Sequence, residues 1–391
     1  MKARGWNAPD LRKRNRAGIL NLVHSTRNIA RNDLALELGL TRASVTILVN
    51  ELIDEGLLEE AGTQIAEGRV GRRKIALRIR PEAGRIIGVG IDQERVQVLL
   101  TDLAGSVLGV RDLPPPATLA RYGDEPAERI VHAVAEATGE LLGPASPCKA
   151  GVLWMGVGVT GRVDAEHGIS VREPRLWNGP VSLADPLALH FGVPTSVDNN
   201  VRALALAELL LTEARGSEPA GLLFVKYGPG VGASWTVGGV PWAGAHNRSG
   251  ELGHTVVAAE GPVCPYCGRV GCLESLVSAR TLGIRLARPR SKIEELCHAL
   301  LEIAPEEFAQ LASWFALALG NAIELYDPTT VALYGAPFRS GPLFDEIADR
   351  VESNERPCEI KRSNLDPELP ALGGAALALE RFFLAGGPKP C

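Results

Sequence analysis

The chain has 391 residues, of which 46% are hydrophobic and 22% are charged, a composition typical of soluble globular proteins with two or three domains. It holds no run of about 18 apolar residues, and no apolar core follows its basic first residues, so we expect neither a transmembrane helix nor a signal peptide. The seven cysteines are an odd number and partly clustered, which favours a reducing cytoplasm.

The first 80 residues form a basic head with a net charge of +6, whereas the other 311 residues carry −11. Apolar spacing predicts a helix over 11–25 and a second helix over 31–38, followed by a turn at Gly39. Thr41 is a good N-cap for a third helix over 42–55. A short helix, a glycine-containing turn and a second helix form the DNA-reading unit of helix-turn-helix proteins. We therefore predict that the head binds double-stranded DNA.

A basic loop over 68–74 and a return strand over 75–79 predict a hairpin, the wing of a winged helix-turn-helix domain over residues 1–80. Recognition helices reach base edges with their N-terminal residues, and arginines favour a narrow minor groove. Arg42 could read guanine, and Ile47 could contact a thymine methyl. The alternative is that these charges only form a solvated surface. The predicted DNA contacts are Arg42, Ser44, Thr46, Ile47 and Asn50 on the helix and Arg69, Arg72 and Arg73 on the wing.

From about Ile86 strands alternate with helices, which predicts an α/β fold with two sheets and a cleft. The expected strands cover 86–92, 96–103, 106–110, 151–159, 195–198, 222–227 and 331–334. The expected helices cover 125–142, 201–211, a helical region over 292–326 and a final helix that opens at Gly373. Apolar residues of the 292–326 region recur at helical spacing and are expected in the core, with a dimer contact as the alternative.

One segment, over 250–274, places a histidine and three cysteines at metal-ligand spacing. Thiolate and imidazole ligands typically form closed, four-coordinate zinc sites, and the glycines between these cysteines permit tight turns. The alternatives are three unrelated buried thiols or a redox pair. We predict a structural zinc site whose ligands are His254, Cys264, Cys267 and Cys272.

The same segment resembles the signature of the ROK family of repressors and sugar kinases, through Glu-x-Gly-His at 251–254 and Cys-Gly-x-x-Gly-Cys-x-Glu at 267–274. The family usually separates its first two cysteines by one residue, and here Pro265 and Tyr266 make two. The resemblance extends over nearly the whole chain and implies an actin-like, hexokinase-type ATPase fold behind the winged helix-turn-helix. It implies an effector-binding and dimerisation domain over 81–391, with a small lobe at about 81–198 plus the C-terminal helix and a large lobe at about 199–370.

ROK kinases carry an Asp-x-Gly-x-Thr phosphate loop and an Asn-Asp pair whose aspartate is the catalytic base. Here the corresponding loop, 92–96, reads Asp-Gln-Glu-Arg-Val, and Asn200 stands at the position of the base. An amide cannot accept the proton of a sugar hydroxyl near neutral pH. Pro229 also removes one amide donor from the second glycine loop. We therefore predict no kinase activity, no catalytic residue and no bound ATP.

The resemblance also implies a sugar site built from amide and carboxylate side chains. In family members the histidine of the motif binds zinc through one ring nitrogen and contacts the sugar through the other. The identity of the sugar stays open among glucose, xylose, N-acetylglucosamine and disaccharides. The implied sugar contacts are Asn199, Asn200, Glu251, His254 and Glu274.

These features predict a cytoplasmic, zinc-containing, sugar-responsive transcriptional regulator, a repressor of carbohydrate-utilisation genes. A homodimer or higher homo-oligomer would present two winged helices to a pseudo-palindromic operator, and sugar binding between the lobes would change the spacing of the heads. No membrane partner is expected. Two alternatives are an active ROK sugar kinase with an appended DNA-binding domain, and a regulator that senses a protein partner.

Overall fold

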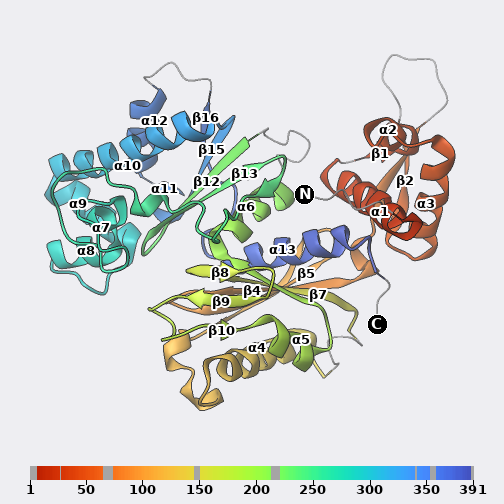
Figure 1. Cartoon of the computed structure of the whole chain (residues 1–391), viewed down its shortest axis with the longest axis horizontal. Coiled ribbons are helices and arrows are strands. Elements are labelled where there is room, and N and C mark those ends of the chain that lie inside the picture. The colour runs from red at the N-terminus through yellow and green to blue at the C-terminus, as the bar shows by residue number, and fades with distance from the viewer. Residues whose placement is uncertain are drawn as a thin grey trace. The chain divides into compact units, whose positions relative to one another are not determined.

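The computed structural model of the chain describes residues 7–26, 28–64, 74–144, 150–212, 221–339, 341–352 and 358–388. By its internal contacts the chain divides into two compact units, Met1–Ser217 with Pro370–Cys391, and Glu218–Leu369. The chain therefore returns to its first unit at the C-terminal end, as the blue helix α13 shows (Figure 1).

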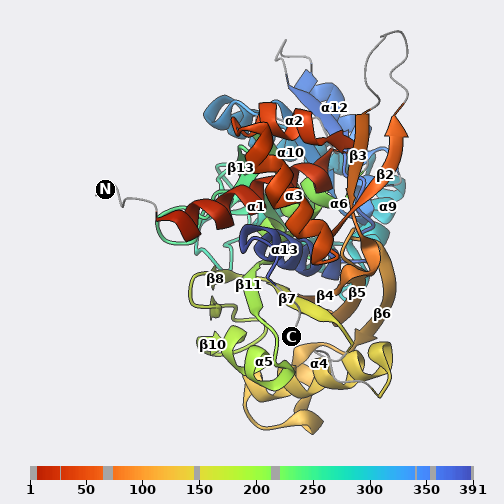
Figure 2. The same cartoon turned by 90° about the vertical axis from the view of Figure 1, so that its right-hand side faces the viewer.

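The head of the first unit is a winged helix-turn-helix with three helices and a three-stranded antiparallel sheet of order β1-β3-β2 (Figure 2). Asn7 caps the first helix by accepting a hydrogen bond from the Asp10 amide, so this helix begins three residues earlier than predicted. The predicted wing loop lies mostly outside the described residues. The elements are α1 (Ala8–Ser25), β1 (Ile29–Ala30), α2 (Arg31–Glu37), α3 (Arg42–Asp54), β2 (Leu58–Gln64) and β3 (Lys74–Ile79).

The rest of the first unit is built on a five-stranded sheet of order β11-β7-β4-β5-β6, in which β4, β7 and β11 are parallel. Helices α6 and α13 cover one face of this sheet, and α4 and α5 cover the other (Figure 1). The strands are β4 (Arg85–Ile91), β5 (Val96–Asp102), β6 (Val107–Leu113), β7 (Val152–Val159) and β11 (Thr195–Asn199). The helices are α4 (Pro126–Leu142), α5 (Ala184–Phe191), α6 (Asn200–Leu211) and α13 (Ala371–Leu384).

A small antiparallel sheet of order β10-β9-β8 follows the strand β7 in the chain, and the sequence did not lead us to expect it. Its strands are only two to four residues long, too short for an apolar alternation to mark them. They are β8 (Arg162–Asp164), β9 (Ile169–Arg172) and β10 (Val181–Ser182).

Helix α13 packs unusually close to the sheet because glycines face it. A Cβ added at Gly156 would lie 2.0 Å from the Gly374 carbonyl oxygen, and one at Gly88 would lie 2.4 Å from the Ala371 carbonyl oxygen. This helix begins at Ala371 rather than at Gly373, where we expected it to open. The glycine pair inside it is therefore a packing feature of the helix and not its start.

The second unit holds a five-stranded sheet of order β14-β13-β12-β15-β16, in which β12, β15 and β16 are parallel. Its strands are β12 (Gly221–Tyr227), β13 (Val231–Val237), β14 (Val240–Pro241), β15 (Thr330–Tyr334) and β16 (Glu359–Arg362). Its helices are α7 (Leu273–Val277), α8 (Ala279–Arg285), α9 (Ile293–Ile303), α10 (Pro305–Tyr326), α11 (Ala336–Arg339) and α12 (Leu343–Glu352).

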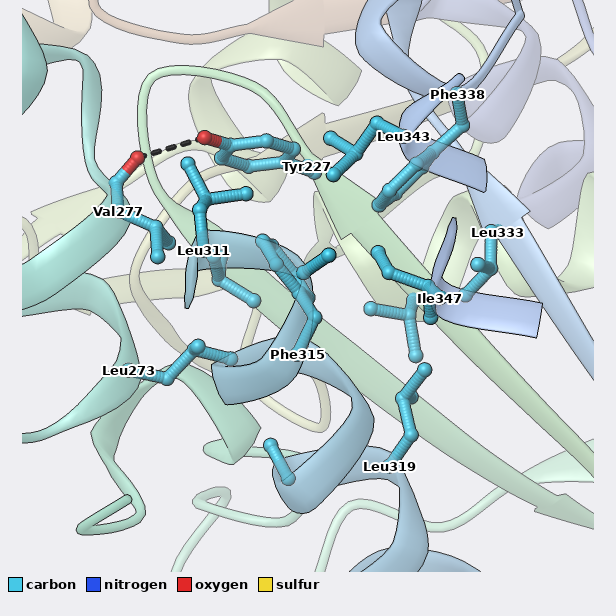
Figure 3. Packing of buried hydrophobic residues seen from close by; sticks show 14 of the residues in the cluster. Tyr227, Leu273, Val277, Leu311, Phe315, Leu319, Leu333, Phe338, Leu343 and Ile347 are labelled. Carbon is cyan, nitrogen blue, oxygen red and sulfur yellow. Dashed lines mark hydrogen bonds between the residues drawn. The ribbon is translucent and has the colours of Figure 1, made fainter. Parts of the chain in front are cut away.

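The core of the second unit forms where α10 and α12 meet the sheet (Figure 3). The rings of Tyr227 and Phe315 lie 4.8 Å apart, and the Tyr227 hydroxyl donates to the Val277 carbonyl. The helical region expected over 292–326 is two helices, because Pro305 starts a new one. Among the described residues, α10 alone has the length and apolar composition of a membrane span, which is weak evidence because its apolar face is part of this core.

Candidate functional site

The four predicted metal ligands converge in the second unit. His254 ends a short 3-10 helix (Leu252–His254), and Cys272 immediately precedes α7. Cys264 and Cys267 lie on a tight turn closed by the hydrogen bond from the Gly268 amide to the Cys264 carbonyl. One ligand atom from each of the four side chains lies within 4.8 Å of all the others.

The distances inside this cluster suit a four-coordinate cation. Nδ1 of His254 lies 3.8 Å from the Cys264 sulfur and 4.0 Å from the Cys272 sulfur, and the Cys267 and Cys272 sulfurs lie 3.9 Å apart. A tetrahedron with metal–sulfur bonds of about 2.3 Å has sulfur–sulfur edges of about 3.8 Å. The additional residue between the first two cysteines therefore does not prevent the ligands from converging, and the cluster can hold a metal ion.

The two ring nitrogens of His254 face different surroundings. Nδ1 belongs to the cluster, whereas Nε2 lies 3.7 Å from a carboxylate oxygen of Glu251. Burial raises the pKa of the Cys272 thiol to about 11, so that thiol is neutral at pH 7 when no cation is bound. Metal binding at this cluster must therefore displace a proton from Cys272.

Glu274, one of the implied sugar contacts, is buried against the second glycine loop. Its Oε2 accepts a hydrogen bond from the Val231 amide at 3.0 Å, and a Cβ added at Gly230 would lie 2.5 Å from the same oxygen. The Gly228 amide donates to the Gly230 carbonyl at 3.0 Å, and Pro229 has no amide hydrogen. Two amides of this loop are thus bound within the unit.

Asn199 and Asn200 lie in the first unit, where β11 runs into α6. Asn199 is the N-cap of α6, since its Oδ1 accepts from the amides of Val201 and Arg202 at 2.9 and 3.2 Å. Its Nδ2 donates to the Gly161 carbonyl at 2.8 Å. Asn200 is the first residue of the helix and is buried. The structure thus gives Asn199 a capping role that the sequence analysis did not assign.

A buried ion pair stands beside these asparagines. Oδ1 of Asp198 accepts from Nε of Arg202 at 2.7 Å, and the Arg202 side chain is only 4% exposed. The same oxygen accepts from the Asn199 amide at 2.6 Å. The sequence analysis missed this pair, although the i, i+4 spacing of an aspartate and an arginine across a helix start is a recognisable signal. The Asp198 carboxylate is therefore fixed in position by the Arg202 guanidinium and the Asn199 amide.

The segment 92–96, which the sequence analysis compared with the kinase phosphate loop, begins with a tight turn between β4 and β5. Oδ1 of Asp92 accepts from the amides of Glu94 and Arg95 at 2.8 and 2.9 Å. The Asp92 amide in turn donates to the Arg95 carbonyl at 3.1 Å. Two backbone amides of this turn are thus bound by the side chain of its first residue.

On the recognition helix α3, Thr41 is the N-cap as predicted, and its hydroxyl oxygen accepts from the Ser44 amide at 3.1 Å. Arg42 is exposed, and the Ile47 side chain is 57% exposed. The Thr46 hydroxyl donates to the Arg42 carbonyl at 2.8 Å, one turn back in the same helix. Arg42 and Ile47 thus lie on the exposed side of α3.

Asn50, also predicted to contact DNA, is exposed and accepts a hydrogen bond from a side chain of α2. Its Oδ1 accepts from the Arg31 guanidinium at 3.1 Å, and Arg31 forms an ion pair with Glu60 at 2.6 Å. Arg31 was not among the predicted residues, because its approach to α3 depends on how α2 packs. The three wing residues Arg69, Arg72 and Arg73 lie outside the described residues.

Known proteins resemble the chain over most of its length. The model of the ROK family matches residues 86–381. The xylose repressor of Bacillus subtilis (strain 168) is 25% identical over 390 residues, covering 95% of this chain and 97% of that protein. The DNA-binding transcriptional dual regulator NagC of Escherichia coli (strain K12) is 25% identical over 344 residues, covering 84% of this chain and 82% of that protein.

Solved structures have a similar fold. A ROK family transcriptional regulator, described as a homolog of the E. coli MLC protein, has a TM-score of 0.78 at 23% identity and covers 96% of this chain and 98% of its own. A ROK hexokinase from Thermus thermophilus has a TM-score of 0.61 at 25% identity and covers 75% of this chain and 97% of its own. The fold is therefore α/β, a winged helix-turn-helix followed by the two-lobed actin-like, hexokinase-type fold, and the chain belongs to the ROK family.

Proposed function

We propose that this chain is a sugar-responsive DNA-binding transcriptional regulator that represses carbohydrate-utilisation genes. The observation that carries the proposal is the combination, in one chain, of a winged helix-turn-helix and a ROK domain. Two relatives that align with 95% and 84% of this chain are named as a xylose repressor and as the regulator NagC. The exposed Arg42 and Ile47 on α3 supply a hydrogen-bond donor and an apolar group for base edges in a major groove.

We infer that the ROK domain does not transfer a phosphoryl group and does not need ATP. The amides of Glu94 and Arg95 already donate to the Asp92 side chain, so these two amides of the 92–96 loop are not available to bind a phosphate. Asn200 cannot serve as the general base, and its neighbour Asp198 is held by the Arg202 guanidinium. These two features support a regulator over a kinase.

The metal held by the cysteine cluster is, in this proposal, a structural zinc ion. Three thiolates and one imidazole form the ligand set of many closed zinc sites, in which no position is left open for a substrate. When bound, zinc supplies four strong bonds that hold the backbone between His254 and Cys272. Since Glu251 and Glu274 flank this segment, the metal would also fix the positions of two implied sugar contacts.

The proposed sugar contacts are Asn199 and Asn200 in the first unit and Glu251, His254 and Glu274 in the second. His254 has one nitrogen for the metal and directs the other toward Glu251, so a sugar hydroxyl could bond to either group. Of these residues Asn200 and Glu274 are buried and Glu251 is exposed. Buried amide and carboxylate groups discriminate sugars strongly, because a missing hydroxyl leaves them without a partner.

The proposal includes an assembly and a location. A homodimer or higher homo-oligomer would bind a double-stranded operator with two heads in the cytoplasm, without a membrane partner. The sugar regulates only if it binds one conformation of the protein more tightly than another. Residues 1–80 would form the DNA-binding domain and 81–391 the effector-binding domain with its two lobes.

The test begins with DNA. The full chain is used to select duplexes from a randomised library, and fluorescence anisotropy then measures the affinity with D-xylose, D-glucose or N-acetyl-D-glucosamine present, each with and without ATP. We expect one sugar to change the DNA affinity by about 5-fold or more, with no ADP produced. Sugar-dependent ADP formation would instead support the kinase alternative, and failure to select any duplex would contradict the regulator.

A further inference from the structure

The segment that follows α13 binds the DNA-binding head, within the first unit. Nε of Arg16, on α1, donates to the Gly386 carbonyl at 2.8 Å, and Nη2 of Arg16 donates to the Gly387 carbonyl at 3.2 Å. Both glycines have positive φ, +81° and +65°, so the turn that presents these two carbonyls is one that glycine adopts without strain. We name residues 385–388 the C-terminal strap.

Arg16 also contacts two carboxylates at the C-terminal end of the recognition helix α3. Its Nη1 donates to the Glu55 carboxylate at 3.1 Å, and Glu51 lies 3.8 Å away. Glu51 lies in α3 and Glu55 is its C-cap. The Arg16 side chain is only 12% exposed, so these contacts are shielded from competing water. One guanidinium therefore joins the C-terminal end of α3 to the strap.

Close apolar packing surrounds this junction. A Cβ added at Gly387 would lie 2.8 Å from Cδ1 of Leu57 and 2.9 Å from Cδ1 of Leu20, both of which are buried. The rings of His24 and Phe383 lie 5.1 Å apart. In both views α1 and α13 are neighbours (Figures 1 and 2). The head and the end of α13 thus share one packed interface.

The other end of α13 packs against α6, whose N-cap Asn199 and first residue Asn200 are proposed sugar contacts. A Cβ added at Gly373 would lie 3.0 Å from the Leu204 amide nitrogen and 3.1 Å from the carbonyl carbon of Ala203. Because helices this close cannot slide freely past each other, a shift of α6 would be passed to α13. The strap lies at the far end of that same helix.

We propose that Arg16 is a positioning residue that couples the recognition helix, through the C-terminal strap and α13, to the start of α6. The proposal rests on the proposed function, since it concerns how the state of Asn199 and Asn200 reaches the DNA-binding face. A displacement of α13 would move the Gly386 and Gly387 carbonyls, and Arg16 would carry that movement to Glu51 and Glu55. The contiguous contacts supply a physical route for such coupling, and the coupling itself is what the experiment measures.

Reciprocity provides a test that needs no identified sugar. If α6 and the DNA face are coupled, DNA binding must change the conformational equilibrium of α6 by the same factor by which α6 changes DNA affinity. We would measure amide hydrogen exchange of the full chain with and without a duplex selected from a randomised library. In the wild type we expect the duplex to change exchange by about 5-fold or more at residues 200–204, as well as at α3.

The variant Arg16→Met keeps the length of the side chain and removes its hydrogen bonds to Glu55 and the strap. We expect the duplex still to protect α3 in this variant, while the change at 200–204 is lost. A residue with a merely structural role would lower stability and DNA affinity without separating these two responses. Gly387→Ala is the second variant, because it disturbs the strap and leaves the guanidinium in place.

Arg12→Met is the matched control. Arg12 lies one turn earlier on α1 and forms an ion pair with Glu51 at 2.5 Å, but its side chain is 56% exposed. We expect this variant to transmit the response to 200–204 as the wild type does. Circular dichroism shows whether Arg16→Met folds. If it does not fold, the exchange response of Gly387→Ala at 200–204 is used as the test of the proposal.

The outcomes separate the two proposals. Transmission that is lost in Arg16→Met or Gly387→Ala and kept in Arg12→Met supports the role of Arg16. Wild-type protein that binds DNA without any change at 200–204, or an Arg16→Met variant that transmits the change fully, overturns it. Failure to select any duplex contradicts the proposed function instead.

Discussion

The polar side chains of the cysteine and histidine cluster and those on the outer face of α3 differ in the partners that they have. In the cluster, four ligand atoms face one another within 4.8 Å, an arrangement that a cation completes. On α3, the Thr46 hydroxyl donates a hydrogen bond to the carbonyl of Arg42 in the same helix, and the side-chain oxygen of Asn50 accepts one from Arg31 on α2. We expect the cluster to depend on a bound ion for its stability, whereas Thr46 and Asn50 of α3 already have hydrogen-bond partners within the head. Changes in the cluster should therefore affect stability most, and changes on α3 should affect DNA recognition.

The largest effect is expected from removal of the metal. Loss of a structural metal is among the few changes that destabilise a protein by about 4 kcal/mol or more. We expect a strong chelator to lower the midpoint of thermal unfolding of the wild type, and Cys272→Ala to lower it to a similar extent without further response to the chelator. Metal analysis of the purified wild type should find zinc.

A buried thiol outside the cluster provides the control. Cys297 is 4% exposed and packs beside Tyr227 in the core of the second unit, so it matches Cys272 in burial. Cys297→Ala should lose stability through packing alone and should remain as sensitive to the chelator as the wild type. Wild-type protein that purifies without metal and ignores the chelator would show that the cluster holds ordinary thiols.

A smaller effect is expected from Arg42→Ala on the outer face of α3. A good contact between arginine and a base edge contributes about 1–3 kcal/mol of discrimination. The variant should therefore bind its selected duplex more weakly and lose its preference at particular base pairs, as measured by anisotropy with singly substituted duplexes. Thr46→Ala should change the affinity by less than about 0.5 kcal/mol, because that hydroxyl already bonds the Arg42 carbonyl. Equal losses in the two variants would contradict this distinction.

Features whose residues lie close together in the sequence could be predicted from it. The four metal ligands lie within residues 254–272, so their spacing alone indicated that they would meet. Thr41 was predictable as an N-cap for the same reason, because it bonds an amide three residues away. Long apolar strands such as β4 and β7 were recognisable because they are buried over nearly their whole length.

Contacts between distant residues were not predictable from local patterns. Arg16 reaches carbonyls 370 residues further along the chain, and Arg31 reaches Asn50 only because α2 packs beside α3. The start of α13 at Ala371, by contrast, follows Pro370, a local signal of a helix start that the prediction at Gly373 did not use. Whether the implied sugar contacts bind a sugar stays a prediction, because it depends on groups brought together by the fold and by a ligand.

The smallest effects concern two threonines of α3 whose hydroxyls make different bonds. Thr41→Ala removes the N-cap and leaves the Ser44 amide without its partner, which should cost about 1 kcal/mol. Thr46→Ala removes a bond from a hydroxyl to the carbonyl one turn back, and alanine has the higher helix propensity, so stability should be unchanged or rise by about 0.5 kcal/mol. Amide hydrogen exchange along α3 should thus be faster in the first variant and unchanged or slower in the second. A destabilisation of equal size in both would mean that the Thr46 hydroxyl supports the helix as strongly as the cap does.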